Sequence, residues 1–319
     1  MTRSNALLAL STAALLTSSA AAADRLVPSQ YPTIQAAVDA ALPGDKVRIA
    51  DGVYDEGVMV VGKHDLAIKG DDDVFVRMIW VDGSTQVSVK EITYFEANDY
   101  QLIVTGSNGV DVRFSTFQNG PAGVGAFYSQ DVNVRDSDFM ALSNGVYFEG
   151  CQQSRIAAMF VGTEVAAIVT GGSGNVIEDC PFKDAGAVFV ESAPFTTIRS
   201  NSFKQTRLHV DASSGVLVEG NNFKKAPHDA IYLNGVFDAT IQGNKVKKSA
   251  VNGLRIDAGG GNLVFANKIA KAGVSGIQLF SAGNSLQQNK VKKSAQLDLV
   301  DHTGGQNFYA FNKIKTSNL

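Results

Sequence analysis

The sequence contains little cysteine and little histidine, and this scarcity excludes two structural classes. Only Cys151 and Cys180 occur among 319 residues, so the chain is not a small fold held by a framework of disulfides. The four histidines, at positions 64, 209, 228 and 302, show none of the Cys/His spacings of structural zinc sites. No metal held by sulfur or nitrogen ligands is expected, and both cysteines are interpreted as small, partly buried residues.

Long hydrophobic runs are also missing. The apolar stretch Ala6–Leu16 is shorter than the ~20 residues that a membrane-spanning helix needs, and no later segment approaches that length. With Arg3 before it and Ala21–Ala23 after it, the stretch has the organisation of a secretory signal peptide. We therefore expect residues 1–23 to be a signal peptide and the mature protein to be periplasmic or secreted, without membrane insertion.

Each half of the chain is poor in charge of one sign. Residues 24–200 carry 12 Lys and Arg against 24 Asp and Glu, whereas residues 201–319 carry 15 against 7. A basic C-terminal half is typical of a protein that binds an anionic partner. Because the chain is expected to be exported and its front half is acidic, we expect an acidic polysaccharide rather than nucleic acid.

The sequence does contain a repeat. The heptapeptide NKVKKSA occurs at Asn244–Ala250 and again at Asn289–Ala295. Related segments begin at intervals of 20 to 23 residues, at positions 115, 137, 159, 180, 201, 221, 244, 267, 289 and 312. Between them, apolar and variable residues alternate and are interrupted by Gly, Asn and Ser, which is typical of strands and turns. Repeats of about 22 residues with two or three strands each predict a parallel β-solenoid of roughly eleven or twelve turns.

Two further features fit a solenoid. The asparagines that open the last six repeats are expected to stack into an internal ladder, because an unpaired buried amide is costly. Residues 32–43 place Ile34, Ala37, Val38 and Ala41 on one helical face, which predicts a helix that caps the N-terminal end. No matching helix follows at the C-terminal end, so an oligomer formed through that end is left open.

The segment PTIQAAVDAALPGDKVRIADGVYDEGV, followed by repeated GIxL and NxF or NxI patterns, resembles the right-handed parallel β-helix proteins of the pectin-lyase-like superfamily. The resemblance covers residues 26–315. It implies one all-β domain over residues 24–319, a right-handed single-stranded parallel β-helix with an N-terminal capping helix. The superfamily includes polysaccharide lyases, uronan epimerases, pectin methylesterases, polygalacturonases and non-catalytic periplasmic proteins of the NosD type, so the fold alone selects no activity.

The motifs of the individual subfamilies are incomplete here. Gly52–Glu56 matches the GxYxE segment of pectin methylesterases, but the catalytic glutamine and paired aspartate motifs of that subfamily are absent, as is the Gly-His-Gly of polygalacturonases. Ala226–Asp229 resembles the Asp-Pro-His-Asp/Glu motif of mannuronan C5-epimerases, with Ala226 in place of the first aspartate. Asp229 also fits an ordinary polar turn residue.

Alternation along the strands predicts which side chains face outward. In each apolar–x–apolar strand, x and the residue after the second apolar position point away from the core. The first outward column is predicted to contain Tyr147, Val169, Phe189, His209, Tyr232, Arg255, Gln278 and Asp298. The second is predicted to contain Glu149, Gly171, Glu191, Asp211, Asn234, Asp257, Phe280 and Val300. The resemblance implies that this face forms a polysaccharide groove.

These columns place three candidate catalytic residues in consecutive turns. Chemistry at C5 of a uronate needs a base, a proton donor and a cation beside the carboxylate. We predict that His209 is the base, Tyr232 the proton donor and Arg255 the carboxylate clamp. His228 is an alternative base. The second column adds three candidate substrate-binding residues in the same turns, namely Asp211, Asn234 and Asp257.

Lysine recurs three and four residues after the asparagine position of the repeat. In a solenoid such lysines form a continuous basic ridge, and Lys224 and Lys247 are candidate ligands of an acidic polysaccharide. Lysine in turns also keeps a repetitive β-protein soluble and discourages lateral sheet pairing. The ridge therefore has both a functional and a structural explanation.

The sequence thus predicts an exported β-helix protein that acts on an acidic, uronate-containing polysaccharide by β-elimination or C5-epimerisation. The alternative is a non-catalytic glycan-binding protein or a periplasmic accessory or scaffold protein, favoured by the absence of a complete catalytic motif. No cofactor is assigned. Calcium is left open, because Asp211 with Asp257, or the acidic run Asp71–Asp73, offers oxygen ligands if the carboxylates converge.

Overall fold

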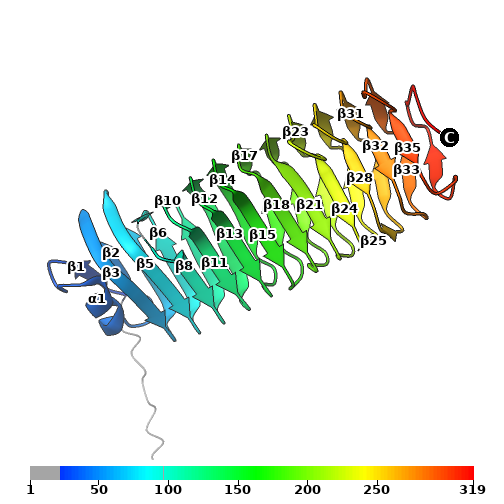
Figure 1. The fold of residues 1–319 in the computed structure, drawn as a ribbon. Helices are drawn as coiled ribbons and strands as arrows, with labels where there is room; N and C mark the ends of the chain where they lie inside the picture. The colour runs from blue at the N-terminus through cyan, green and yellow to red at the C-terminus, as the bar shows by residue number, and fades with distance from the viewer. Residues whose placement is uncertain (1–21, 96) are drawn as a thin grey trace, which may run out of the picture.

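The computed structural model describes residues 22–95 and 97–319, so the predicted signal peptide lies almost entirely outside the described residues. The described chain winds into a right-handed parallel β-helix of about 13 turns, with roughly 22 residues per turn (Figure 1). The repeat predicted eleven or twelve turns, because the first turns lack the recognisable asparagine segment. None of the helices in the described ranges has both the length and the apolar character to cross a membrane.

Each turn contributes strands to three faces, and each strand pairs in parallel with its equivalents one turn before and one turn after. The first face comprises β1 (Asp24–Val27), β2 (Lys46–Ile49), β4 (His64–Gly70), β6 (Thr85–Lys90), β9 (Asn108–Arg113), the first part of β12 (Gln130–Met140) and of β14 (Arg155–Val161), β16 (Val176–Glu178), β19 (Thr197–Arg199), β22 (Leu217–Glu219), β26 (Thr240–Gln242), β30 (Leu263–Phe265), β33 (Ser285–Gln287) and β36 (Phe308–Ala310).

The other two faces follow in chain order within each turn. The second face comprises the first part of β3 (Gly52–Val61) and of β5 (Val74–Asp82), β7 (Thr93–Tyr94), β10 (Thr116–Gln118), the ends of β12 and β14, β17 (Pro181–Lys183), β20 (Ser202–Lys204), β23 (Asn222–Lys224), β27 (Lys245–Lys247), β31 (Lys268–Ala270) and β34 (Lys290–Lys292). The third face comprises the ends of β3 and β5, β8 (Tyr100–Thr105), β11 (Ala122–Phe127), β13 (Asn144–Glu149), β15 (Val165–Thr170), β18 (Ala187–Glu191), β21 (Arg207–Asp211), β24 (Ile231–Asn234), β28 (Leu254–Ile256), β32 (Ile277–Leu279) and β35 (Leu299–Asp301). A separate two-stranded pair joins β25 (Val236–Phe237) to β29 (Gly259–Gly260).

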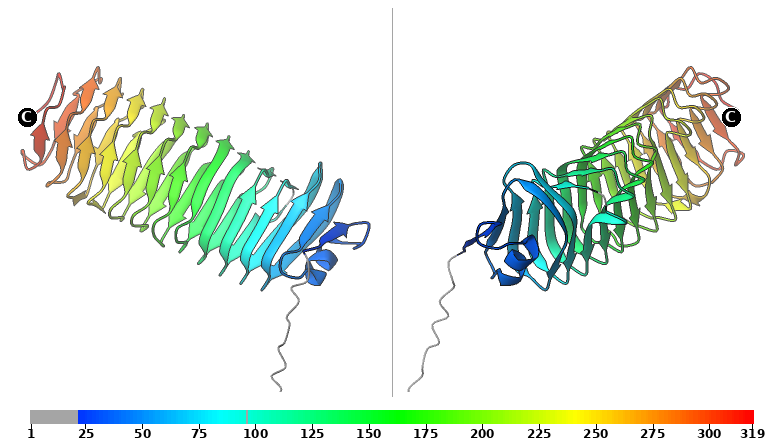
Figure 2. Two further views of the ribbon diagram at one scale, coloured as in Figure 1. Left: turned by 180° about the vertical axis from the view of Figure 1, so that it is seen from behind. Right: turned by 60° about the vertical axis from the view of Figure 1, so that its left-hand side comes forward.

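The predicted helix that caps the N-terminal end is confirmed. Helix α1 (Ile34–Ala40) lies across the first turns (Figure 2) and buries Ile34, Ala37 and Val38 against them. Thr33 caps it through its hydroxyl, which accepts a hydrogen bond from the Ala36 N–H. Glu56 accepts hydrogen bonds from the N–H groups of Ile34 and Gln35 at 3.0 and 3.1 Å. The Gly52–Glu56 segment therefore serves to fix this helix.

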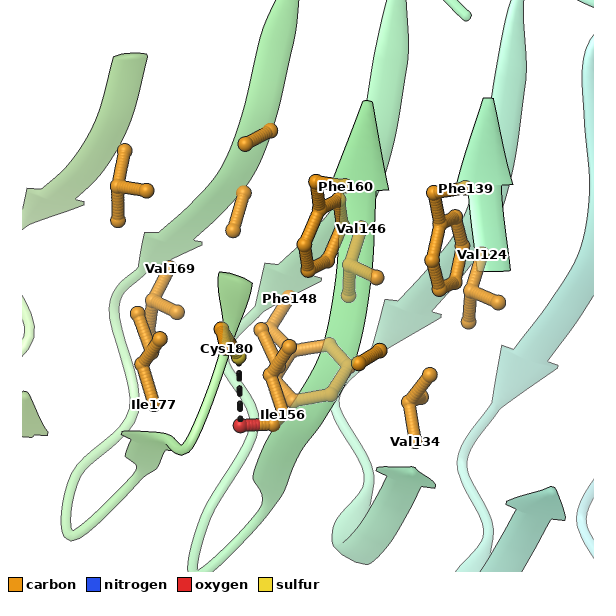
Figure 3. Close-up of a cluster of buried hydrophobic side chains, with 14 of the residues drawn as sticks. Val124, Val134, Phe139, Val146, Phe148, Ile156, Phe160, Val169, Ile177 and Cys180 are labelled. Carbon is orange, nitrogen blue, oxygen red and sulfur yellow. Dashed lines mark hydrogen bonds between the residues drawn. The ribbon is translucent and has the colours of Figure 1, made fainter. Parts of the chain in front are cut away.

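The core is built from columns of identical or similar side chains. Seven aromatic rings stack along the second face with centroid distances of 4.3 to 5.1 Å, and they belong to Tyr94, Phe117, Phe139, Phe160, Phe182, Phe203 and Phe223. Later turns fill the same column with Val246, Ile269 and Val291. Figure 3 shows part of this column packed against the valines and isoleucines of the other faces.

Both cysteines are buried and free, as the sequence predicted. The Cys180 thiol lies 3.5 Å from the Ile156 carbonyl oxygen (Figure 3), and the Cys151 thiol lies 3.3 Å from that of Ala126. Burial raises the pKa of Cys151 to about 11 and that of Cys180 to about 12. Neither thiol is therefore a reactive or metal-binding group at neutral pH.

The predicted asparagine ladder is confirmed. Its members are Asn201, Asn221, Asn244, Asn267, Asn289 and Asn312. Each side-chain N–H₂ group donates to the Oδ1 of the asparagine one turn later, at 3.0 to 3.1 Å. Oδ1 also accepts the backbone N–H of the preceding asparagine, as from Asn221 to Asn244 at 2.9 Å. The buried amides are therefore satisfied by repetition itself.

The predicted outward columns contain two errors of register. In β15, Ile168 and Thr170 face outward, whereas Val169 is buried. In β35, Val300 pairs with Gln278, and His302 stacks on Phe280 with ring centroids 4.3 Å apart. Both errors arise where the inward position holds an atypical residue, Ala167 in the first case and the buried Asp301 in the second.

Candidate functional site

The third face brings His209, Tyr232 and Arg255 side by side. They occupy equivalent positions of β21, β24 and β28, since His209 pairs with Tyr232 and Tyr232 pairs with Arg255. The rings of His209 and Tyr232 meet edge to face with centroids 4.7 Å apart, and the Arg255 guanidinium lies 5.5 Å from the Tyr232 ring centroid. Identical register in three stacked turns thus produces one contiguous group.

Asp257 ties two members of this group together. Its carboxylate accepts hydrogen bonds from Arg255 Nε at 2.6 Å and Nη2 at 2.8 Å, and another from the Tyr232 hydroxyl at 2.8 Å. Burial and the hydrogen bond to Asp257 raise the pKa of Tyr232 to about 12. Tyr232 is therefore protonated at neutral pH and can donate a proton but not accept one.

His209 lies in a less polar environment than its neighbours. Its ring packs between Tyr232 and Phe189, whose ring centroid is 5.4 Å away. Burial lowers the pKa of His209 from its ordinary value, against the opposing effect of Asp211. The imidazole is consequently neutral at neutral pH, which is the protonation state that a general base requires.

A pocket of about 280 Å³ opens beside these residues, and we call it the His209 pocket. The pocket forms where the connection between the second and third faces becomes longer from one turn to the next. Two residues connect β20 to β21, whereas the six residues 225–230 connect β23 to β24. The longer connection brings His228 to the edge of the pocket. The lining residues are Arg207, His209, His228, Asp229, Tyr232, Val251 and Arg255.

Asp229 lines this pocket, but its carboxylate also has a structural partner. Its Oδ1 accepts the backbone N–H of Asn252 at 2.8 Å, and the Asn252 side chain accepts that of Ser275 at 3.0 Å one turn later. Asp229 therefore belongs to a second, shorter ladder of turn residues. Asp229 and His228 are the two polar side chains of the segment that resembles the epimerase motif, and among the described residues only that of Asp229 has a hydrogen-bond partner.

The second outward column is only partly available to a ligand. Asp211 accepts a hydrogen bond from the Asn234 amide at 2.9 Å, while Asp257 is engaged by Arg255 and Tyr232. Of the acidic run that was also considered for calcium, Asp71 forms an ion pair with Arg48. Across the described ranges, no three His, Cys, Asp or Glu side chains come together as metal ligands.

Lys224 and Lys247 do not lie on the third face. They pair with one another on the second face, in β23 and β27, and their side chains are exposed. The structure therefore separates the predicted site residues into two groups on adjacent faces. The loop 225–230, which carries His228, joins the two faces.

Sequence reasoning missed Arg207 and Val251 as part of this surface, whereas Phe280 was predicted in the second outward column. Arg207 and Val251 line the His209 pocket, and the Arg255 guanidinium lies 5.1 Å from the Phe280 ring centroid. Arg207 stands just before the first apolar position of its strand, where the alternating pattern assigns no direction. Only the change in connection length between positions 205 and 225 signals that a pocket forms here.

Comparisons with known proteins agree with the fold. A family model described as "Right handed beta helix region" matches residues 76–207, and one described as "Periplasmic copper-binding protein (NosD)" matches residues 162–319. A search of curated proteins found no match.

Several solved structures are similar in fold at low sequence identity. The catalytic unit of a thermostable GH87 alpha-1,3-glucanase from Streptomyces thermodiastaticus superposes with a TM-score of 0.63 at 11% identity, over 89% of this chain and 66% of the glucanase chain. The periplasmic alginate epimerase AlgG gives a TM-score of 0.53 at 12% identity, over 74% of this chain and 64% of that one. The A-module of the Azotobacter vinelandii mannuronan C-5 epimerase AlgE6 gives a TM-score of 0.55 at 15% identity, over 82% of this chain and 94% of the AlgE6 module. This chain thus spans just under two thirds of the first two proteins, and at such identities the similarity establishes the fold alone.

The residues present do not fit the copper site that the description of the second family model names. The two thiols are buried and protonated, and His209 and His228 share a pocket without a third ligand in the part of the chain that the structure describes. Copper sites in proteins are built from converging imidazole, thiolate or thioether ligands. No step proposed below passes through a metal.

Proposed function

Because this chain is a right-handed parallel β-helix of the pectin-lyase-like type, we propose that it is an exported protein that acts on an acidic, uronate-containing polysaccharide at the His209 pocket. The reaction is β-elimination or C5-epimerisation. The observation that carries the proposal is the composition of that pocket, where a neutral histidine, a protonated tyrosine and an arginine lie side by side. The polysaccharide-acting proteins among the similar structures support the choice of substrate class.

The roles follow from protonation state and position. His209 takes the proton from C5 of the uronate, and the electron pair of the broken C–H bond moves toward the carboxylate carbon. Arg255 stabilises the charge that develops on the carboxylate oxygens. In elimination, the electrons re-form as a C4–C5 double bond, the bond from C4 to the glycosidic oxygen breaks, and Tyr232 donates its proton to that oxygen. In epimerisation, a water molecule on the opposite side of the ring donates a proton to C5, and the proton taken by His209 returns to the solvent.

Asp257 and His228 have supporting roles in this scheme. Asp257 holds the Arg255 guanidinium and the Tyr232 hydroxyl in place, so Tyr232 must exchange its hydrogen bond to Asp257 for one to the substrate. His228 lies at the rim of the pocket, on the connection between β23 and β24, and serves as the alternative base. Asp211 and Asn234, hydrogen bonded to one another, bind sugar hydroxyls beside them.

The test is proton NMR of alginate, pectate and glycosaminoglycan samples incubated with the purified protein, with and without calcium. We expect new signals of unsaturated or inverted uronate. His209→Gln is expected to lower the rate by roughly 10²–10⁴-fold, because a positioned base contributes about that much. His64→Gln, which alters an exposed histidine of β4, serves as the matched control and should leave the rate unchanged. No new signal with any of these substrates would contradict the proposed reaction.

A second candidate function is non-catalytic binding of the same polysaccharide by a periplasmic accessory protein. It is favoured by the occupied Asp257 carboxylate and by the match of residues 162–319 to the NosD family model. The pocket volume of about 280 Å³ also lies just below the ~300–1,000 Å³ range of small-molecule sites. Broadened sugar resonances without new signals would identify this function.

A further inference from the structure

The second face of the C-terminal turns is covered with lysine. We call this surface the lysine face. Its members occupy the first, third or fourth position after a ladder asparagine or, in the case of Lys183, the third position after Cys180 in the preceding turn, and all of them are exposed. They are Lys183, Lys204, Lys224, Lys225, Lys245, Lys247, Lys248, Lys268, Lys271, Lys290, Lys292, Lys293, Lys313 and Lys315.

The register of the strands stacks these lysines directly on one another. Lys245 pairs with Lys268, which pairs with Lys290, while a second column runs from Lys204 through Lys224 to Lys247. Adjacent turns are ~4.8 Å apart, and like charges at such positions repel. Within the described ranges the one lysine that forms an ion pair with a carboxylate is Lys69, on the first face. The lysine face therefore carries uncompensated positive charge.

Four of these lysines occupy the left-handed backbone conformation, which is unfavourable for most residues that have a Cβ. Lys225, Lys248, Lys271 and Lys293 have φ values of 55°, 64°, 61° and 62°. Gly and Asn adopt this left-handed conformation most easily. Solubility alone does not require lysine at these positions, since exposed lysines already flank them on the strands. Repeated lysine at an unfavourable conformation indicates selection for charge at this corner.

A hollow interrupts the lysine face where the column of third positions lacks a lysine. Ala270 occupies the place that Lys247 holds one turn before and Lys292 one turn after. The hollow has a volume of about 420 Å³, and no aromatic side chain lines it. The lysines that surround it are Lys245, Lys247, Lys268, Lys271, Lys290, Lys292 and Lys293.

We propose that the lysine face binds a linear acidic polysaccharide that runs along the axis of the solenoid, with one of its anionic groups in the hollow at Ala270. The strip is long and only about 7 Å wide between the first and third positions of each strand, which suits a single extended chain better than a membrane surface. Single-stranded nucleic acid is usually held by aromatic stacking platforms as well as charge, and the hollow has none. The inference rests on the proposed function for its ligand class, but not for any catalytic step.

The first test removes charge where the backbone favours another residue. The probe is a fluorescein-labelled alginate oligosaccharide, and affinity is measured by fluorescence polarisation at several salt concentrations. Lys248→Asn with Lys271→Asn is expected to weaken binding about tenfold and to reduce its dependence on salt. Lys46→Asn with Lys90→Asn makes the same change of charge on the first face and should alter affinity less than about twofold. An equal loss of affinity in both variants would show that only the net charge of the protein matters, and it would overturn the proposal.

The second test fills the hollow. Ala270→Glu places a carboxylate among the seven lysines, so it should raise the melting temperature and lower the affinity for the probe. Ala270→Gln fills the same space without charge and should change both quantities less. An Ala270→Glu variant that is stabilised but binds the probe as well as the wild type would show that no anionic group enters the hollow.

Two further measurements determine which class of ligand binds and which face of the solenoid binds it. A single-stranded DNA oligonucleotide and vesicles containing phosphatidylglycerol are measured at the same salt concentration as the probe, and tighter binding of either one would overturn the assignment to polysaccharide. His209→Gln should abolish turnover without weakening the probe's binding to the lysine face. If His209→Gln instead removes binding and the lysine variants do not, the polysaccharide lies on the third face alone. These outcomes distinguish the absence of the proposed reaction at the His209 pocket from the absence of polysaccharide binding at the lysine face.

Discussion

At the residue scale, the environment of His209 distinguishes this side chain from the other three histidines. It is half buried between two aromatic rings and neutral because burial lowers its pKa. The burial that keeps the His209 imidazole neutral also makes its protonation unfavourable for the folded state. The pH dependence of stability is therefore a test of the pocket that does not depend on turnover.

We expect the wild type to lose stability as the pH falls below about 6.5, the ordinary pKa of histidine. The folded-state pKa of His209 is lowered, so between the two pKa values the unfolded chain binds more protons and acid favours unfolding. Above pH ~6.5 this effect is absent. Thermal unfolding of His209→Gln between pH 5 and 7.5 should show a smaller loss than the wild type. His64→Gln should follow the wild type, and an unchanged pH dependence in His209→Gln would contradict the assigned environment.

The register of the three candidate catalytic residues was predictable because their strands alternate regularly. His209, Tyr232 and Arg255 lie between inward-facing aliphatic residues in every turn. Nothing in the repeat pattern indicated that Asp257 would bind both Tyr232 and Arg255, since that contact depends on side-chain conformations across a turn. The repeat spacing did assign Lys224 and Lys247 to a separate basic ridge, and the structure places them on the second face.

At the scale of the repeating element, the asparagine ladder explains why one residue recurs so strictly. Each amide joins three turns, since it donates to a carbonyl one turn before and to an asparagine one turn after while accepting a backbone N–H. A hydrophobic residue of similar size would leave these backbone groups unpaired. The ladder was predictable from the spacing because only a solenoid stacks residues about 22 apart.

Asn244→Ala is expected to lower the free energy of unfolding by about 3 kcal/mol, because buried groups on both neighbouring turns lose their partners. Asn312→Ala, at the half-exposed last rung, should cost only about 1 kcal/mol because water replaces the lost contacts. Urea denaturation of both variants measures the difference. Equal costs at the two rungs would show that the ladder is not the source of the stability.

The helix and the two register errors show where element-level prediction succeeds and fails. The apolar spacing over residues 32–43 located α1, but its start at Ile34 depends on Thr33 and on a glutamate more than 20 residues away. The alternation failed at Ala167 and Asp301, because an inward alanine or aspartate interrupts the apolar pattern on which the alignment depends. Local pattern thus determines the type of element, whereas its exact position depends on contacts from other turns.

At the scale of the whole molecule, charge is distributed along the axis of the solenoid. The acidic turns come first and the lysine face follows, so opposite charges lie at opposite ends rather than in contact. Positive charges that repel one another destabilise the folded state and are screened by salt. The consequence is a stability that depends on ionic conditions.

We expect the melting temperature to rise when sodium chloride is increased from 20 to 300 mM. The rise should be smaller in Lys248→Asn with Lys271→Asn, which carries less repulsion, and unchanged in Lys46→Asn with Lys90→Asn. Alginate at low salt should raise the melting temperature of the wild type as well, because a ligand of the folded state stabilises it by mass action. Differential scanning calorimetry measures these melting temperatures. If salt raises the melting temperature of the two double variants equally, the repulsion does not arise from the lysine face.

The near-identity of successive turns has a consequence for how such a protein changes over evolutionary time. Each turn contacts only its two neighbours, and its inward residues repeat those of the next. Duplication of one segment of about 23 residues therefore inserts a complete unit that extends the core, the ladder and the lysine face together. The two copies of NKVKKSA lie two turns apart at equivalent positions of the repeat, so the same seven residues fit either turn. If the lysine face binds polysaccharide as proposed, the length of polysaccharide bound changes by one turn of the solenoid with each such duplication.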